Sequence, residues 1–426
     1  MSGASAFQAN GRFQLSDPVA QQWARRAVLF LGILMSGGLL IFSRPLLLVG
    51  VVALSFLLIN PVAIFRREFS RIWILLLLVG AVSSIGAGVL ALEPLAIRYS
   101  NFVAGVFMLA LYIERDRNQF AADLVPILAL MSVQALLTVA LAETVPGIFS
   151  QFQINDATYN TIFYIFTYHS FIDDPSLIQR PDGFFFEPGV LQLYLNIYLY
   201  IALFMLRRPA HIVLALAGVI STQSTTGVVI AVGLLGVAYF RHLKVAKLNE
   251  KLLVLILAPL MIVPFVFLAI DNVNEKFYGI TAGSSWAREF DLYTGMRVAF
   301  EYPLTGIGFD YQRYFDVASR VAYLETRLDT ATITERPNSN GIATLFYSIG
   351  FPLGLVFLWG MYRQRFFATK HVMFVLLFLS LMAEALIFTP FPLMILYSGL
   401  LVGRRSTAPS PERDQRPTAL PAHARA

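Results

Sequence analysis

Long apolar runs recur along almost the whole chain, and they restrict its fold more than any other feature of the sequence. Most of them approach the roughly 17–25 residues that an α-helix needs to cross a bilayer. The pattern therefore predicts an all-α polytopic membrane protein with about 12 transmembrane helices, forming one integral membrane domain over residues 1–403. The predicted spans are 27–43, 45–64, 72–92, 99–113, 121–142, 184–206, 209–222, 226–240, 252–270, 339–362, 371–388 and 390–403.

The placement of charge agrees with a membrane domain. Only 14% of the residues are charged and 57% are hydrophobic, whereas about 25% of a soluble domain is charged. The net charge of +6 lies in short clusters that follow every second apolar run. This is the positive-inside pattern, so we predict cytoplasmic termini and no nucleic-acid partner. The clusters are Arg25-Arg26, Arg66-Arg67, Arg207-Arg208, Arg241 to Lys251, Arg363 to Lys370 and Arg404-Arg405.

Three further features define the predicted chain: its first apolar run, its C-terminal residues and its lack of cysteine. No cleavage site for a signal peptidase follows the first apolar run, which is therefore predicted to remain as a membrane helix. Residues 404–426 are rich in Pro, Ala, Arg and Ser and are predicted to form a disordered cytoplasmic tail. A chain with no cysteine has neither disulfides nor thiolate metal sites.

Two long polar segments, 143–183 and 271–337, are predicted on the side opposite the basic clusters. In the first, four aromatic residues are spaced by seven, four and three positions: Phe152, Tyr159, Phe163 and Phe166. This spacing predicts an amphipathic helix in the membrane interface, whose rings could also stack on sugars. The second segment predicts a helix that ends at the turn sequence "PLTGIG".

Arg288 and Arg297 of the second segment are predicted to point to opposite sides of that helix. Both could serve one site only if the helix broke at Gly295. Arg297 also has Glu301 four residues on, so a structural ion pair is the simpler interpretation of this arginine.

The sequence lacks the motifs of nucleotide-driven, metal-dependent and hydrolytic enzymes. It has no P-loop and no G-x-S-x-G elbow, and its five histidines are scattered. We predict no metal and no cofactor. No internal repeat is visible, which argues weakly against a transporter. The polar stretch "STQSTTG" at 221–227 is predicted to be a helix-to-helix turn with capping hydroxyls.

The outer segments do carry arginines and a carboxylate next to a predicted membrane helix: Arg180, Glu187, Arg288 and Arg297. A guanidinium group binds two phosphate oxygens at once. Polyprenyl diphosphate sugar carriers are the abundant diphosphates of an outer membrane surface, and they need no nucleotide. The alternative is structural: Arg180 snorkels to the interface and Glu187 pairs with an arginine.

Three short motifs support a family resemblance. "RPDGFFFEPGVLQLYL" is similar to an R-x-x-G-x-F-x-E-P signature, and "REFDLYTGMRVAFEYPLTGIG" is similar to an arginine-bearing helix ending in P-L-x-G-x-G. "SNGIATLFYSIGFPLGLVF" is similar to a stretch that opens the next helix. With these motifs the chain resembles the Wzy-type polysaccharide polymerases and the related O-antigen ligases. Ser339 stands where many ligases have histidine, which favours a polymerase.

The resemblance implies a GT-C-like glycosyltransferase of the bacterial inner membrane that polymerises undecaprenyl-diphosphate-linked oligosaccharides in the periplasm. Arg180, Glu187 and Arg288 would be catalytic. Substrate-binding candidates are Arg297, Asn338, Asn340 and Tyr311, and the alternative for the two asparagines is that they cap the following helix. Membrane lipid, a chain-length regulator and a flippase of the same pathway are expected partners. The alternative functions are an O-antigen ligase and a polysaccharide flippase or transporter.

Overall fold

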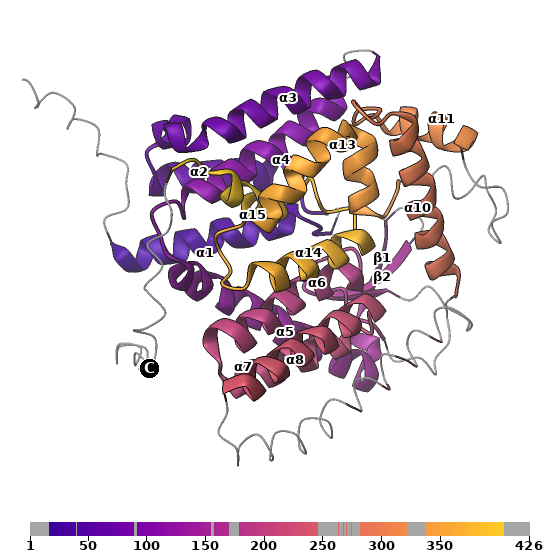
Figure 1. Ribbon diagram of the computed structural model, residues 1–426. Helices are drawn as coiled ribbons and strands as arrows, with labels where there is room; N and C mark the ends of the chain where they lie inside the picture. The colour runs from indigo at the N-terminus through magenta and orange to yellow at the C-terminus, as the bar shows by residue number, and fades with distance from the viewer. Residues whose placement is uncertain are drawn as a thin grey trace, which may run out of the picture.

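The computed structural model describes residues 17–39, 41–88, 92–154, 157–169, 179–245, 282–321 and 337–403, and the single positions 263, 267, 270 and 274. Most of these residues form helices that pack into one bundle (Figure 1). The helices are α1 (Pro18–Met35), α2 (Arg44–Leu58), α3 (Ser70–Ala87), α4 (Leu92–Ala110), α5 (Arg117–Thr144), α6 (Pro188–Ile201), α7 (Pro209–Ser221), α8 (Thr225–Val245), α10 (Ala282–Glu301), α11 (Tyr311–Val321), α13 (Gly341–Tyr362), α14 (Lys370–Ala383) and α15 (Pro390–Leu400).

The lengths and apolar surfaces of these helices support a helical membrane protein. Five stretches in the described part of the chain are long and apolar enough to cross a bilayer: 67–87, 117–144, 188–206, 225–244 and 341–362. Four shorter apolar helices, α2, α7, α14 and α15, accompany them. Nearly all of the predicted span 252–270 lies outside the described residues, as does the predicted tail 404–426.

Helix α6 forms the centre of the bundle. Every residue from Pro188 to Ile201 is buried, and α5, α7, α8 and α14 pack around the helix. A helix that is apolar on nearly all sides can lie in a protein core or in a bilayer, and α6 is covered by its neighbours in the bundle. The side-chain amide of Asn196 is buried, and its Nδ2 donates a hydrogen bond to the carbonyl of Gly227 at 3.1 Å.

The aromatic segment after α5 is a small antiparallel sheet, so the predicted interfacial helix is wrong. Strands β1 (Ser150–Ile154), β2 (Ala157–Ile162) and β3 (Phe166–His169) pair in the order β1-β2-β3. Phe152 and Tyr159 are directly opposite each other, and their rings stack at 5.3 Å. Phe163 and Tyr164 have positive φ in the turn between β2 and β3, and this conformation ends any helical repeat.

The predicted continuous helix at 339–362 is broken at Gly350, which has φ 74°. Pro352 has no N–H to donate to the Ser348 carbonyl, so the carbonyl needs another donor. The "PLTGIG" turn supplies the missing partners. Ile307 N–H donates to Tyr347 O at 2.7 Å, and Gly308 N–H donates to Ser348 O at 3.1 Å.

The turn in return accepts from the broken helix, because Phe351 N–H donates to Pro303 O at 2.8 Å. Gly306 and Gly308 have φ values of 63° and 84°, which allow this close backbone approach. The connection that follows α10 is therefore hydrogen-bonded to the backbone in the middle of α13.

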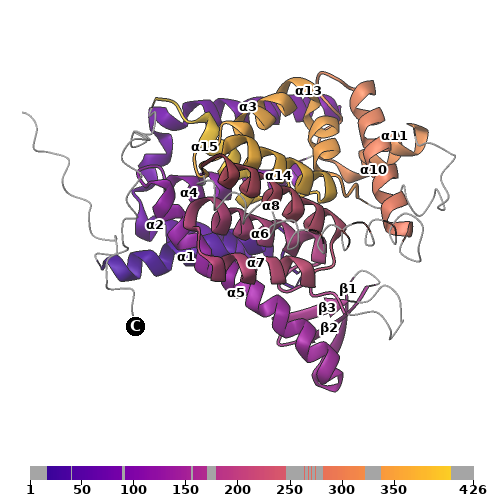
Figure 2. The same ribbon diagram turned by 60° about the horizontal axis from the view of Figure 1, so that its bottom comes forward.

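The sheet, α10 and α11 lie at the same end of the bundle in both views (Figure 2). The stretch 179–187 leads from this end into α6. Leu39 N–H donates to Phe184 O at 2.8 Å and Phe186 N–H donates to Gly37 O at 3.3 Å, so the α1–α2 connection holds it in place.

Candidate functional site

The loop that carries Arg180 is fixed by a backbone hydrogen bond to β3 and by close packing against α5. Asp182 N–H donates to Thr167 O at 2.8 Å, which joins the loop to β3. Gly183 has φ 65°, and an added Cβ would lie 3.1 Å from Oε1 of Gln134 on α5. Only glycine combines this backbone conformation with so little space. The local sequence Asp182-Gly183 therefore sets the direction in which Arg180 points.

Arg180 points to the turn between α7 and α8. Its Nε donates to the carbonyl of Thr222 at 3.2 Å. The predicted turn in "STQSTTG" is confirmed, with Ser224 Oγ accepting from Gly227 N–H at 3.3 Å. Because Nε is engaged, the guanidinium plane is oriented while its two terminal nitrogens remain for other partners.

Arg180 lies among four charges from three separate parts of the chain. Burial lowers the pKa of Arg180, and Arg288 lowers it further, whereas three carboxylates raise it. These carboxylates belong to Asp182, Glu187 and Glu384. The fold therefore brings the two predicted arginines, from the first and second outer segments, into one electrostatic cluster.

Arg288 makes its contact with a residue that sequence reasoning missed. Its Nη2 donates to Oε1 of Glu384 at 3.4 Å. Glu384 follows the last residue of α14 and was hidden inside the predicted span 371–388. The signal in the sequence was a lone carboxylate within an apolar run, which is costly in a bilayer and is usually functional.

Glu187 occupies the N-cap position of α6, but its side chain makes no capping hydrogen bond. No hydrogen bond joins its carboxylate to any residue in the described part of the chain. The structure thus shows a carboxylate near Arg180 that retains its acceptor capacity. The start of α6, with its positive dipole end, lies beside it.

Asn338 and Asn340 connect α10 to α13. Asn338 Nδ2 donates to Asp291 O at 2.6 Å and to the Tyr314 hydroxyl at 2.9 Å. Asn340 Oδ1 accepts from Ala343 N–H at 2.9 Å, so the capping alternative is confirmed for Asn340. Both amides are buried. Their hydrogen bonds hold the framework that supports Arg288.

Ser339 is engaged by the same helix. Its N–H and its hydroxyl donate to Asp291 Oδ2 at 2.9 and 2.5 Å. Asp291 lies one turn after Arg288 on α10, so this contact fixes the height of Arg288 relative to the start of α13.

Arg297 and Tyr311 lie apart from this cluster. Helix α10 continues through Gly295, and exposed Arg297 donates from Nη1 to Val321 O at 3.2 Å. The predicted Arg297–Glu301 ion pair does not form. The Tyr311 hydroxyl accepts from Nη2 of Arg98 at 2.8 Å, a contact that the sequence did not indicate.

A buried pair lies beneath the Arg180 loop. His169 Nδ1 and Asp182 Oδ2 are 2.7 Å apart, with side-chain exposures of 2% and 0%. Burial raises the pKa of Asp182 to about 7, although His169 opposes the shift. This pair joins β3 to the stretch that carries Arg180.

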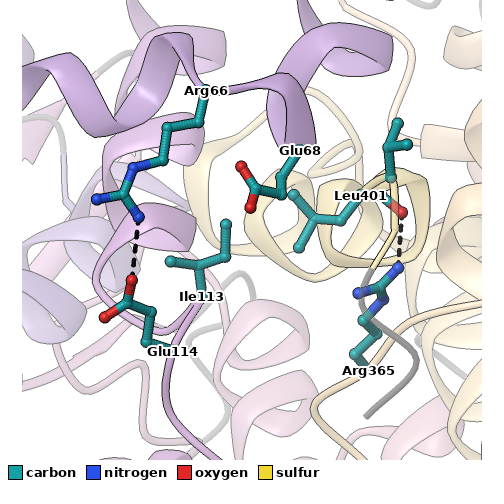
Figure 3. Close-up of a pocket in the computed structure, with 7 residues that line it drawn as sticks. Arg66, Glu68, Ile113, Glu114, Arg365 and Leu401 are labelled. Atoms are coloured by element: carbon teal, nitrogen blue, oxygen red, sulfur yellow. Dashed lines mark hydrogen bonds and ion pairs between the residues drawn. The ribbon is translucent and has the colours of Figure 1, made fainter.

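Other polar features do not add to this cluster. Among the residues that the structure describes, no three His, Cys, Asp or Glu side chains group as metal ligands would. A separate pocket opens at the far end of α13 (Figure 3), where Arg66 pairs with Glu114 at 3.0 Å and Arg365 donates to Leu401 O at 2.6 Å. None of the predicted site residues line it.

No family model, curated protein or solved structure matches this chain.

Proposed function

We propose that the protein is a polysaccharide polymerase that joins oligosaccharide units carried on undecaprenyl diphosphate. The observation that carries the proposal is the convergence of Arg180 and Arg288, because each uses one N–H group in its contact with Thr222 or Glu384 and has further N–H groups that an anionic ligand can accept from. The start of α6 adds a positive dipole end at the same place. This combination suits a diphosphate.

The lipid-linked character of the substrate is inferred from the surroundings of the cluster. The arginines lie at one end of a helical bundle whose long helices are apolar enough for a bilayer. A diphosphate whose prenyl chain remains in the bilayer would reach this level. The sequence contains no P-loop, which makes a nucleotide-linked donor the weaker choice.

The proposed orientation puts this end in the periplasm and both termini in the cytoplasm of a bacterial inner membrane. The basic clusters at the other end support this orientation under the positive-inside rule. A dozen spans with a GT-C-like arrangement remain part of the proposal.

In the proposed reaction, a hydroxyl of one unit attacks the anomeric carbon of the chain on a second carrier. The bond from that carbon to the diphosphate oxygen breaks, and undecaprenyl diphosphate leaves. Glu187 accepts the hydroxyl proton, because its carboxylate is the one in the cluster without a hydrogen bond to a described residue. Arg180 and Arg288 stabilise the charge on the departing diphosphate.

The test is a deletion strain of the source bacterium examined for surface and lipid-linked glycan. Loss of the polymerase leaves single units on the carrier and on any acceptor. Long polymer stranded on its carrier would identify a ligase instead. Lipid-linked units retained in the cytoplasmic leaflet would identify a flippase, and full-length surface polymer would refute all three.

A further inference from the structure

The contact between Arg288 and Glu384 is made by one edge of the guanidinium group. Nη2 donates to the carboxylate, at 3.4 Å. The remaining N–H groups of Arg288 donate to no residue that the structure describes. The Arg288 side chain is 30% exposed, whereas that of Glu384 is 4% exposed. The carboxylate thus lies behind the guanidinium, whose other edge is open.

Glu384 itself has a fixed backbone. Its N–H donates to Ser380 O at 3.1 Å, and its carbonyl accepts from Leu386 N–H at 2.8 Å. An added Cβ on Gly341 would lie 2.6 Å from the same carbonyl, so the start of α13 also packs on it. The chain cannot shift here without disturbing α13 and α14 together.

The Glu384 carboxylate lies against the start of α6, in the space beside Gly189. A Cβ at Gly189 would overlap Oε1 of Glu384 and would lie 3.5 Å from Nη2 of Arg288. Gly189 has no need for an unusual φ, because it lies within a regular helix. The missing side chain makes room for the carboxylate, and the positive end of α6 favours a negative charge there.

We propose that Glu384 is a positioning residue that holds Arg288 against the start of α6, with the open edge of its guanidinium directed at the substrate diphosphate. The inference rests on the proposed function, since it assigns the ligand of that edge. Arg180 is oriented separately through Thr222. Each arginine therefore has its own hydrogen-bond support, and Glu384 positions Arg288 directly while acting on Arg180 only through its charge.

The expected effect follows from geometry. A misplacement of about 1 Å in a catalytic group costs on the order of a hundredfold in rate. Gly189→Ala would displace the Glu384 carboxylate while leaving every charge in place. Glu384→Gln would keep the shape and remove the charge. Both variants should lower kcat on the order of a hundredfold.

The experiment uses the full chain in detergent with lipid-linked oligosaccharide units, and it follows polymer formation. Gly236→Ala is the matched control, because nothing lies within 4 Å of a Cβ at that position on α8. Binding of farnesyl diphosphate, measured by calorimetry, is the second readout. We expect weaker binding in Gly189→Ala and in Glu384→Gln, and unchanged binding in Gly236→Ala, at equal melting temperature.

A double variant separates positioning from general stability. If Glu384 acts through Arg288, Glu384→Gln causes no further decrease in activity or probe binding in an Arg288→Ala background. Additive decreases, or wild-type kinetics in both single variants, would overturn the inference.

The two proposals can fail separately. If the wild-type protein makes no polymer in this assay, the polymerase proposal fails. Weakened farnesyl diphosphate binding in Gly189→Ala would still support the role of Glu384 in that case, and unchanged binding would refute it. An active wild-type enzyme with a fully active Gly189→Ala variant refutes the inference alone.

Discussion

Replacing Arg180 with lysine isolates the shape of its guanidinium from its charge. In the structure, Nε is bonded to Thr222 O at 3.2 Å, and this contact orients the plane that carries the two terminal nitrogens. Lysine keeps the positive charge but offers a single ammonium on a flexible stem. It has neither the orienting hydrogen bond nor the paired donors.

The size of the effect follows from one hydrogen bond between the guanidinium and the diphosphate. A hydrogen bond to a charged group contributes about 1.5–3 kcal/mol. If the departing diphosphate lacks one such bond in the transition state, a change of about 1.5–3 kcal/mol lowers the rate about 13- to 160-fold. Arg180→Ala also removes the charge and should be more severe.

The assay is polymer formation by purified variants at matched protein concentration. Arg320→Lys is the control, since this exposed arginine on α11 donates to Asp316 O of its own helix at 3.0 Å. It should retain wild-type activity. Wild-type activity in Arg180→Lys would refute bidentate diphosphate binding, because charge alone would then suffice.

Four further outcomes are expected. The Asp182 carboxyl has a pKa near 3.8 in the unfolded chain and about 7 in the folded protein, so the folded protein binds its proton more tightly. The stabilisation that this group contributes therefore falls as the pH rises from 3.8 towards about 7. The melting temperature of Asp182→Asn should lack this decline, and an identical decline in both proteins would contradict the assignment. Gly306→Ala should reduce the melting temperature, because a Cβ there overlaps Tyr347 O and the backbone has φ 63°. Backbone strain alone should cost about 1–3 kcal/mol. Gly147→Ala, with open space around it, is the control, and equal melting temperatures would argue against the hydrogen bonds between the "PLTGIG" turn and α13. Alkaline phosphatase fusions at Phe163 and Asp316 should both be active, and an inactive fusion at either position would separate the two arginines by the membrane. Polymer formation should continue in chelator, and an inhibition that magnesium reverses would contradict the metal-free proposal.

The helical framework was accessible from sequence because apolar length is a strong signal in a membrane protein. The aromatic residues from Phe152 to Phe166 misled the prediction, since a spacing of seven, four and three also fits short strands joined by a tight turn. Local periodicity does not report the pairing partner that decides between a helix and a sheet. The break in α13 was missed for a related reason, because Gly350 and Pro352 need a distant turn to satisfy the freed carbonyls.

The candidate site was likewise only partly predictable from the sequence. Arg180 and Arg288 could be selected from motifs, and the structure brings them together. Glu384 could not be assigned to them, because an ion pair across 96 residues leaves no local pattern. The direction of Arg297 depended on whether α10 breaks at Gly295, and the helix continues there in close packing against Ala343 and Asn338.

The enclosure of α6 has a consequence for how the protein is made. Ribosomes deliver α6 to the membrane before α7 and α8, and long before α14, yet all three cover it in the finished bundle. Until α14 has been synthesised and inserted, the side-chain amides of Gln192 and Asn196 lie in a bundle that does not yet enclose α6. The last helices to be synthesised therefore close the core and also bring Glu384 to Arg288, so assembly and completion of the site end in the same step.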